Sequence, residues 1–373
     1  MSKKKVLYVL SGSILGVGVI LAIFILTFGI NLNPGVSLEE KNVTAHKESN
    51  ELKPMTAGPS LNSGTYLDVG DDPERIEVVE VKQVTTDGGY YPKSWSPNGA
   101  YIAVVKSGHT LLFDAEGKMI KEFDRTFRNW SLDSKKIICA GMWTVDVESG
   151  EKKKVTEEKG YDPAFLPSGD RVIFHSKDGL SIVDTGTGQT ETLINGPDDN
   201  FSHIWYVSDD RIFYVKRKRK ISSEFFLYRY NSITKEERKI YSYEVIAPVY
   251  LLTPKGEIVI RSGPDPRSGD AIITDENGET ISDMANFARG DWNIGFMDFS
   301  PNGKLLLFSE YVSDGHAVSR DDLYIYSLDG KKKKRITNTE TVIESDVKWS
   351  PNGDKIFFTD DDENIYLITI SKK

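Results

Sequence analysis

Five polar residues recur at one place in the sequence, two to four positions before a repeated aromatic residue. They are Tyr91, Arg128, Asp162, His203 and Asp346. Side chains of these types can hold a polar ligand, and aspartate and histidine can also transfer protons or bind a metal ion. Long stretches of chain separate them, so they can form one site only if a repeating fold brings equivalent positions together.

The aromatic residues belong to a repeat in which a short segment is followed by a turn and an apolar run. The clearest copies are SWSPNGAYIAVV (Ser94 to Val105), FSPNGKLLLFSE (Phe299 to Glu310) and WSPNGDKIFFTD (Trp349 to Asp360). In Ser-Pro-Asn-Gly each residue suits its position in a type I β-turn, so every copy predicts two strands joined by a tight turn. Seven copies occur in all, because weaker ones begin at Trp130, Phe165, Tyr206 and Leu252.

The second half of the unit also recurs, as an alternating strand, a glycine turn and a polar strand. Each unit therefore holds four strands within about 35 to 50 residues, and the longer units absorb their extra length between strands, as in SDGHAVSRDD (Ser313 to Asp322). No helical pattern occurs after residue 74. These features predict an all-β fold, a seven-bladed β-propeller over residues 75–373. The first strand of each blade lines the central channel, which would bring the five polar residues to one channel mouth.

The last copy has room for only three strands before the chain ends. The segment from about Ile76 to Thr85 resembles the fourth strand of the sixth copy. We therefore expect this N-terminal segment to lie beside Ile365 to Ile370, completing the last blade and removing an open edge.

The aromatic residue, Ser-Pro-Asn-Gly, the apolar strand and a lysine-rich strand ending in Ile-Thr or Val-Thr together resemble the TolB-like propeller repeat. This repeat is also called PD40 and is related to WD40. The resemblance covers about residues 75–373 and is sharpest in the first, sixth and seventh copies. It implies an extracytoplasmic bacterial propeller of the kind that serves as a scaffold in the cell envelope. The chain departs from the family in having no α/β domain before the propeller and in having seven units instead of six.

The N-terminus carries a targeting signal. Residues 1–5 contain three lysines, and residues 6–30 carry no charge. As a helix this run would be about 37 Å long, enough to cross a bilayer core of about 30 Å. The positive-inside rule places residues 1–5 in the cytoplasm as a short tail and the rest of the chain outside. A cleaved signal peptide is the alternative, but the run is long for one and no small-x-small site follows it. We expect a single-pass transmembrane anchor at 6–30 and a flexible polar stalk at 31–74.

Composition and motifs limit the chemistry. The net charge of −9 argues against a dedicated nucleic-acid-binding protein, and the single cysteine excludes an internal disulfide. The sequence has no G-x-S-x-G elbow, no P-loop and no H-E-x-x-H. We therefore expect no catalytic motif, no cofactor and no motif-based metal site, and the five residues before the aromatics remain binding candidates.

Two basic runs offer another way to bind anions. KKKKR (Lys331 to Arg335) falls on a predicted outermost strand, where lysines prevent edge-to-edge association. KRKRK comprises Lys216, Arg217, Lys218, Arg219 and Lys220. It falls in a predicted loop between strands, so it is the better candidate for contacting an anionic polymer or lipid headgroups.

Taken together, the sequence favours a membrane-tethered, extracytoplasmic propeller that binds an envelope protein or a cell-wall polymer and is not an enzyme. The alternative is a propeller-type lyase or hydrolase whose site lies at the channel mouth. The two hypotheses differ in whether the polar residues at the mouth only hold a ligand or also transform it.

Overall fold

The computed structural model describes residues 66–373, apart from residues 197–200, 209–210, 218–223, 245–248, 253–257, 263–269, 276, 284–292, 314–317, 328–331 and 340–341. The described residues belong to one compact unit of the chain, Met55–Lys373. The expected cytoplasmic tail, the anchor at 6–30 and the stalk up to residue 65 lie outside them. In the part of the chain that is described, no helix is long and apolar enough to cross a membrane.

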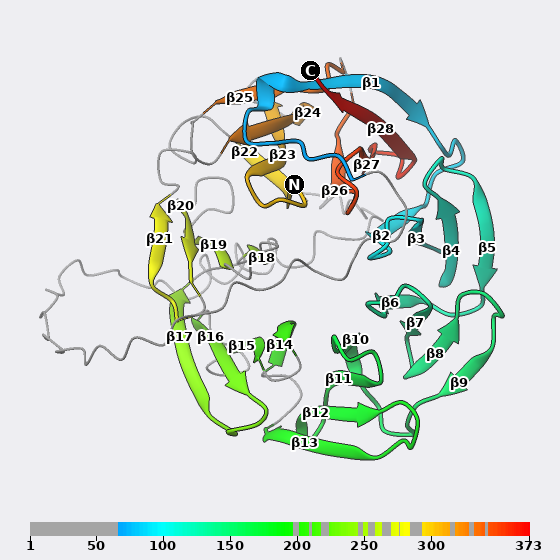
Figure 1. The fold of residues 1–373 in the computed structure, drawn as a ribbon, viewed down its shortest axis with the longest axis vertical. Helices are drawn as coiled ribbons and strands as arrows, with labels where there is room; N and C mark the ends of the chain where they lie inside the picture. The colour runs from blue at the N-terminus through cyan, green and yellow to red at the C-terminus, as the bar shows by residue number, and fades with distance from the viewer. Residues whose placement is uncertain are drawn as a thin grey trace, which may run out of the picture. The chain divides into compact units, whose positions relative to one another are not determined.

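The described residues fold into seven four-stranded antiparallel sheets, with a single 3-10 turn, η1 (Pro73–Arg75), before the first strand (Figure 1). Sheet 1 contains β2 (Tyr91–Trp95), β3 (Tyr101–Lys106), β4 (His109–Asp114) and β5 (Met119–Phe123). Sheet 2 contains β6 (Phe127–Trp130), β7 (Lys136–Cys139), β8 (Trp143–Asp146) and β9 (Lys152–Lys154). Sheet 3 contains β10 (Tyr161–Phe165), β11 (Arg171–Ser176), β12 (Gly179–Asp184) and β13 (Thr190–Asn195).

The later sheets follow the same plan. Sheet 4 contains β14 (Phe201–Ser208), β15 (Arg211–Arg217), β16 (Glu224–Asn231) and β17 (Glu237–Glu244). Sheet 5 contains β18 (Val249–Leu252), β19 (Ile258–Ser262), β20 (Asp270–Thr274) and β21 (Thr280–Asp283). Sheet 6 contains β22 (Asn293–Phe299), β23 (Leu305–Ser313), β24 (Val318–Ser327) and β25 (Lys333–Arg335). Sheet 7 contains β26 (Ser345–Trp349), β27 (Lys355–Thr359), β28 (Ile365–Lys372) and β1 (Ile76–Gln83).

The Ser-Pro-Asn-Gly segment forms the tight turn that its residues favour. Between β2 and β3, the amide of Gly99 donates to the carbonyl of Ser96 at 2.8 Å, and the amide of Tyr101 donates to the Ser96 hydroxyl at 2.9 Å. The Asn98 side chain accepts from the amide of Ala100 at 3.0 Å. Gly99 has a φ of +71°, a left-handed conformation that glycine adopts without steric cost. The copies before β23 and β27 have the same serine-to-glycine hydrogen bond.

Neighbouring sheets pack face to face through apolar side chains. One core cluster joins Trp95 and Ile102 of sheet 1 to Phe357 of sheet 7. Similar clusters join sheets 1 and 2, 2 and 3, 3 and 4, and 6 and 7. Arg229 of sheet 4 donates to Asn277, which precedes the last strand of sheet 5. A sheet four strands wide cannot bury both faces alone, so each repeat depends on its neighbours for its core.

The two ends of the described chain share one sheet. β1 is the outer strand of sheet 7 and pairs antiparallel with β28, with Val78 opposite Ile370 and Gln83 opposite Tyr366. The amide of Val84 continues the ladder by donating to the carbonyl of Ile365 at 2.8 Å. The pairing that the sequence predicts between these segments is therefore present.

Residues 66–74, which the sequence analysis assigns to the stalk, already pack against this end of the structure. Val69 is buried with the core cluster that joins sheets 6 and 7, and Leu67 packs beside it. The amide of Leu67 donates to the carbonyl of Asn352 at 2.8 Å, and Asp68 accepts from the Asn302 amide at 3.0 Å. Both partners belong to Ser-Pro-Asn-Gly turns, so the turns of sheets 6 and 7 hold the chain before β1.

The longest repeat also differs from the expectation of an insertion between strands. β23 and β24 extend together, and Val312 pairs with Arg320. Most of the extra residues after Ser309 therefore lengthen a hairpin. As a consequence Asp321 and Asp322 lie within a strand, and both are fully buried.

Candidate functional site

The first strand of six sheets contains an irregularity close to the aromatic residue that ends it. The pairing register shifts around Lys93 in β2, Arg128 in β6 and His203 in β14. It also shifts around Asp162 and Pro163 in β10, around Asp346 and Val347 in β26, and within β22. Such a bulge leaves the extra residue out of the ladder and redirects its side chain. Four of the five residues singled out in the sequence therefore lie at bulges.

The bulges of β10 and β26 are strained. Asp162 has a φ of +46° and Asp346 a φ of +50°, in the left-handed region that residues other than glycine rarely occupy. Strain of this kind costs about 1–3 kcal/mol for each residue and persists only where the surrounding structure holds it. The first strands contact one another between sheets, β6 with β10 and β26 with β2, so the strained residues lie where neighbouring sheets meet.

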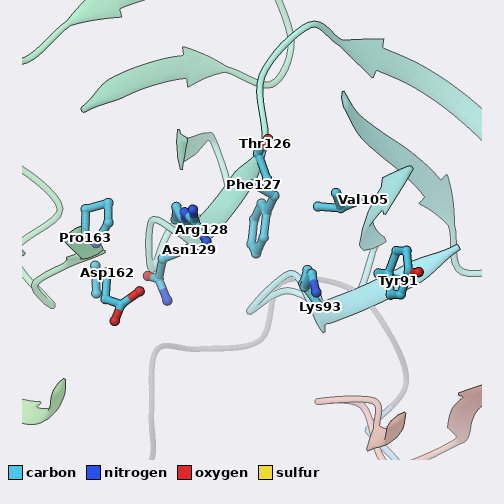
Figure 2. A pocket seen from close by; sticks show the side chains of 10 residues that line it. Tyr91, Lys93, Val105, Thr126, Phe127, Arg128, Asn129, Asp162 and Pro163 are labelled. Atoms are coloured by element: carbon cyan, nitrogen blue, oxygen red, sulfur yellow. The ribbon is translucent and has the colours of Figure 1, made fainter. Parts of the chain in front are cut away.

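A cavity of about 420 Å³ opens between the first strands of sheets 1, 2 and 3 (Figure 2). Its walls include Tyr91, Arg128 and Asp162, three of the five residues that the sequence places at one mouth. Lys93, at the bulge of β2, also lines the cavity and was not among the residues predicted from the sequence. Its position two residues before Trp95 matches that of Arg128 before Trp130, and this equal spacing is the signal that could have found it.

The cavity has an apolar base and a charged rim. Val105, Phe127, Pro163 and Ala164 are buried, whereas the side chains of the rim are exposed. The exposed rim residues are Tyr91, Lys93, Arg128 and Asp162. Neither Lys93 nor Arg128 forms an ion pair with another described residue. The site therefore combines two cationic groups with an apolar surface, which suits a ligand that has an anionic group and a non-polar face.

A second cavity of about 390 Å³ shares Arg128, Asp162 and Pro163 with the first. It extends along the loop between β9 and β10, where Lys154, Lys159 and Tyr161 line it. Glu157 and Glu158 also line it, and Glu157 forms an ion pair with Lys154 at 3.6 Å. Arg128 is thus common to both cavities.

Three aromatic rings in this region each have a lysine ammonium group close to the ring. The Lys93 ammonium lies 5.6 Å from the centre of the Tyr91 ring, and that of Lys159 lies 5.2 Å from the centre of the Tyr161 ring. The Lys154 ammonium lies 5.5 Å from the centre of the Trp143 ring. Tyr91 and Tyr161 are also among the exposed large side chains, at 39% and 38%. Exposed rings with a cation nearby can contact both the non-polar face and the acidic group of one ligand.

Asp162 is coupled to a histidine behind the cavity. The Oδ2 atom of Asp162 lies 3.3 Å from Nε2 of His175, which is only 7% exposed. The Tyr161 ring stacks on the His175 ring, with 5.6 Å between centres and 20° between planes. His175 in β11 is opposite Tyr161 in β10, so the sheet itself brings these groups together. His175 was not among the residues predicted from the sequence, because it has no ligand-like partner two or four residues away.

His203 and Asp346 are the other two residues that the sequence places at the channel mouth. His203 is at the bulge of β14, and its side chain lies outside the described residues. Asp346 lines neither cavity, and burial raises its pKa, an effect that the nearby positive charge of Lys93 opposes. A side-chain hydrogen bond with Glu363 raises the pKa of the Tyr91 phenol.

The basic segment Lys216–Lys220 is only partly the loop that the sequence predicts. Lys216 and Arg217 belong to β15, where Arg217 pairs with Phe225 of β16, while Lys218, Arg219 and Lys220 lie outside the described residues. The expectation of a loop was therefore wrong for the first two residues, because the β15–β16 ladder continues through them. The Lys216 ammonium lies 5.8 Å from the centre of the Tyr228 ring.

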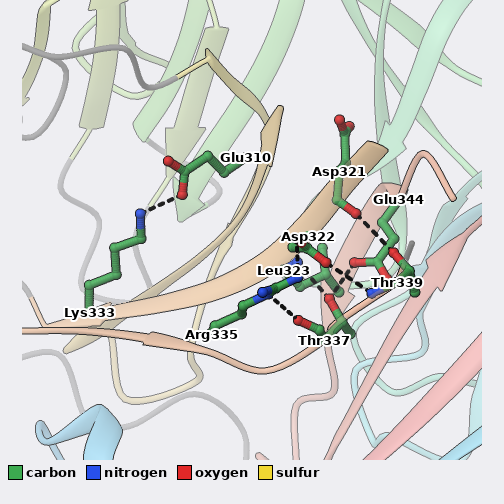
Figure 3. Close-up of polar contacts among 9 residues, drawn as sticks. All are labelled: Glu310, Asp321, Asp322, Leu323, Lys333, Arg335, Thr337, Thr339 and Glu344. Carbon is green, nitrogen blue, oxygen red and sulfur yellow. Dashed lines mark hydrogen bonds and ion pairs between the residues drawn. The ribbon is translucent and has the colours of Figure 1, made fainter. Parts of the chain in front are cut away.

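A second group of charged residues lies between sheets 6 and 7 and is fully buried (Figure 3). We call Asp321, Asp322 and Glu344 the carboxylate cluster. Asp322 accepts from Arg335 at 2.5 Å and from the amide of Thr339 at 3.1 Å. Glu344 accepts from the Thr337 hydroxyl at 2.5 Å.

Three other oxygens of the carboxylate cluster have no hydrogen-bond partner among the described residues. Within the described part of the chain, both carboxylate oxygens of Asp321 and one of Glu344 are buried without a hydrogen-bond partner. Burial, and then the neighbouring Asp322, raise the pKa of Asp321 to about 7. Burial also raises the pKa of Glu344 to about 7.

Figure 3 shows the Asp321 carboxylate pointing away from those of Asp322 and Glu344, so the three do not converge on one point. Among the described residues, no group of three or more histidine, cysteine, aspartate or glutamate side chains could hold a metal ion.

Comparison with known proteins identifies the fold. No protein-family model matches the chain, and no curated protein matches it. Among solved structures it is similar to the β-propeller domain of Cps50 (Swd1) from Myceliophteria thermophila, with 15% identity and a TM-score of 0.57 over 79% of this chain and 100% of that one. The described sheets and these similarities together show an all-β, propeller-type fold.

Two oligogalacturonate lyases are also similar. One, in complex with manganese, has 14% identity and a TM-score of 0.59, covering 78% of this chain and 93% of that one. The other, from Vibrio parahaemolyticus, has 16% identity and a TM-score of 0.57, covering 79% and 96%. At this level of identity the likeness concerns the fold.

Proposed function

We propose that this chain is a membrane-tethered, extracytoplasmic β-propeller that binds an envelope protein or a cell-wall polymer without transforming it. In this proposal residues 6–30 cross the membrane, residues 1–5 remain in the cytoplasm, and the propeller is a relative of the TolB-like family. The uncharged N-terminal run and the Ser-Pro-Asn-Gly repeats support these assignments.

We further propose that the seven sheets are the blades of one closed ring. The pairing of β1 with β28 supports this, since it completes sheet 7 with a strand from the other end of the chain. The packing of sheet 7 against both sheet 6 and sheet 1 also supports it. A ring closed in this way resists opening, because separating the ends requires the loss of a whole strand pairing.

The observation that carries the binding function is the first cavity. Lys93 and Arg128 are exposed on its rim at bulges of adjacent blades, where they gain little from the fold itself. A cavity with an apolar base and a few placed polar or charged groups is the usual form of a ligand-binding site. The propeller provides the rigidity, and the bulges direct these side chains into the cavity.

The test is capture of envelope components by the full-length chain. The protein is reconstituted in membranes and crosslinked to an envelope extract, and the retained protein and polymer are identified. We expect one component to be retained by the wild-type chain and lost with the double variant Lys93→Gln, Arg128→Gln. Retention that survives this variant but is lost when Lys216–Lys220 are changed to glutamine would place the contact at the basic segment. The absence of any retained component would contradict the proposal.

A second candidate is a propeller-type lyase or hydrolase acting at the same cavity. The observation in its favour is the Asp162–His175 pair beside the cavity, since such a pair can move a proton. The similarity to two proteins named oligogalacturonate lyases adds to it. Turnover of acidic glycans or esters by the full-length chain, lost with Asp162→Ala or His175→Ala, would favour this enzyme. Unchanged substrate after prolonged incubation would favour the binding protein.

A further inference from the structure

The two cavities beside β6 are lined in a way that specifies the chemistry of a ligand. They share Arg128, Asp162 and Pro163, so they adjoin at these residues. Each has a volume within the range of about 300–1,000 Å³ that is typical of small-molecule sites. The two volumes together also fall within this range, so the space can accept a ligand of a few linked units.

The ends of the paired cavities carry the same two side-chain types. Tyr91 and Lys93 lie at the first cavity, and Tyr161 and Lys159 lie at the second. In each pair the ammonium group lies close to the ring, at 5.6 and 5.2 Å from its centre. The His175 ring covers one face of the Tyr161 ring. The tyrosines are nevertheless 39% and 38% exposed, so a ligand can contact the part of each ring that is open. A repeated aromatic and cationic pair suits a ligand with a repeated unit.

The unit that fits such a pair has a flat non-polar face and an acidic group. A pyranose ring has one face formed by C–H groups, which packs on tyrosine, and its hydroxyl groups bond to aspartate and asparagine. Asp162 and Asn129 supply such groups at the first cavity. A carboxylate or phosphate on the ring would meet Lys93, Arg128 or Lys159 in charge-assisted hydrogen bonds.

Charge distribution supports an anionic ligand. The whole chain has a net charge of −9. Within the first cavity, Lys93 and Arg128 outnumber the single acidic residue, Asp162. Lys154 and Lys159 line the second cavity together with Glu157 and Glu158, so over both cavities four cationic residues exceed three acidic ones. An acidic protein that exposes two cations in one cavity attracts anions there and repels them elsewhere on its surface. Positive groups at this point thus contribute selectivity as well as affinity.

We propose that the paired cavities bind an acidic oligosaccharide, with sugar rings on Tyr91 and Tyr161 and acidic groups on Lys93, Arg128 and Lys159. This inference rests on the proposed binding function and names the ligand class of the same site. Carboxylate-bearing sugars and phosphate-bearing polyols offer the same anionic groups, and they are distinguished by the probes below.

The experiment measures binding of defined probes to the full-length chain in nanodiscs by calorimetry. The probes are a tetramer of a 1,4-linked uronic acid, maltotetraose as its neutral counterpart, and an oligomer of glycerol phosphate. We expect the uronate tetramer to bind at least about tenfold more tightly than maltotetraose, since charge-assisted hydrogen bonds are lost in the neutral sugar. Its affinity should fall as salt is raised. Tighter binding of the glycerol phosphate oligomer would identify phosphate as the anionic group but would overturn the stacking of sugar rings.

Variants assign the binding to the paired cavities. Arg128→Gln should weaken the uronate tetramer by about tenfold, because one charged partner is removed. Tyr161→Ala should weaken it by several-fold and Tyr161→Phe should not, since phenylalanine keeps the ring. The matched control is Lys118→Gln, an exposed lysine in the turn before β5 that lines neither cavity. Thermal unfolding of each variant shows whether the fold is retained.

The outcomes separate this inference from the proposed function. Equal binding of the acidic and neutral tetramers, or acidic binding that Arg128→Gln leaves unchanged, overturns the acidic-oligosaccharide site. If an envelope protein is still captured in that case, the binding function stands with a different ligand. If the uronate tetramer is cleaved, the ligand class is retained and the binding-only function fails.

Discussion

Charged side chains occupy two regions of this protein in opposite ways. Beside β6, Lys93 and Arg128 are exposed at strand bulges and form no ion pair with another described residue. Between sheets 6 and 7, Asp321, Asp322 and Glu344 are completely buried within the packed blades. The first group faces a cavity, and the second faces other parts of the same chain.

This difference indicates that exposed charges mainly affect ligand binding, whereas buried charges mainly affect the stability of the fold. An exposed charge retains its hydration, so its loss changes stability little and its main effect is on ligands. A buried carboxylate has lost its hydration and must either be hydrogen-bonded or take up a proton. Asp322 is hydrogen-bonded to Arg335, whereas Asp321 lacks a partner within the described residues, and its raised pKa reflects this. The predictions below test this contrast.

The largest expected effect is a dependence of stability on pH. Asp321 and Glu344 have pKa values raised to about 7 from ordinary values of 3.8 and 4.5, so the folded state holds more protons between these limits. Their stabilisation is complete below about pH 4 and is lost as pH rises through about 7, by at most ~1.4 kcal/mol per pH unit for each group. Urea unfolding at several pH values measures it. In Asp321→Asn the loss of stability between about pH 4 and pH 7 should be smaller, and an unchanged pH profile would contradict the assignment.

The next effect is the loss of the cation that pairs with Asp322. Arg335→Met leaves a buried carboxylate without its charged partner, which should lower the free energy of unfolding by about 3 kcal/mol. The matched control on the same segment is Lys332→Met, whose side chain is 55% exposed beside Asp72 and should contribute less than about 1 kcal/mol. Denaturant unfolding at one pH compares the two variants. Equal losses would show that burial does not distinguish these ion pairs.

A smaller effect is expected from the cavity cations. Lys93→Gln and Arg128→Gln should each change the free energy of unfolding by less than about 0.5 kcal/mol, because both side chains are exposed. The same variants should still reduce ligand capture. Urea unfolding run beside the capture assay measures both quantities on one preparation. A destabilisation as large as that of Arg335→Met would mean that these cations support the fold.

The smallest effect concerns the thiol behind the cavity. Cys139 is fully buried in β7 opposite Phe127, and burial raises its pKa to about 12. Only about one thiol in 10,000 is ionised at pH 8, so iodoacetamide should label the folded protein very slowly and the urea-unfolded protein quickly. Mass spectrometry of timed samples provides the measurement. Protection should persist in Arg128→Gln, and rapid labelling of the folded variant would show that the cavity residue holds β6 in place.

Local features of the sequence predicted much of the fold. The Ser-Pro-Asn-Gly segments form the expected turns because serine, asparagine and glycine make hydrogen bonds within a few residues of one another. The segment from Val78 pairs with β28 as expected, because the last repeat lacked one strand. Such features depend on short stretches of chain, which the sequence displays directly.

The site was predicted in part. Tyr91, Arg128 and Asp162 do lie around one cavity, because equivalent positions of adjacent repeats meet. Lys93 was missed because Tyr91, two residues earlier, was chosen in β2, whereas the bulge of this strand lies at Lys93. His175 was missed because its role depends on the strand opposite it. The carboxylate cluster was missed because Asp321 and Asp322 were expected in an insertion, and the pairing of β24 with β23 brings them into a buried strand.

By itself the sequence determined the repeating unit, its turns and the strand that completes sheet 7, since these follow from residue types at fixed short spacings. Only the tertiary structure decided which charges are exposed and which are buried. Lys93 and Asp321 both belong to strands, and neither the residue nor its immediate neighbours distinguishes their environments. The free energy of a charge depends on the water that surrounding sheets leave around it, and that is set by the packing of segments far apart in the chain.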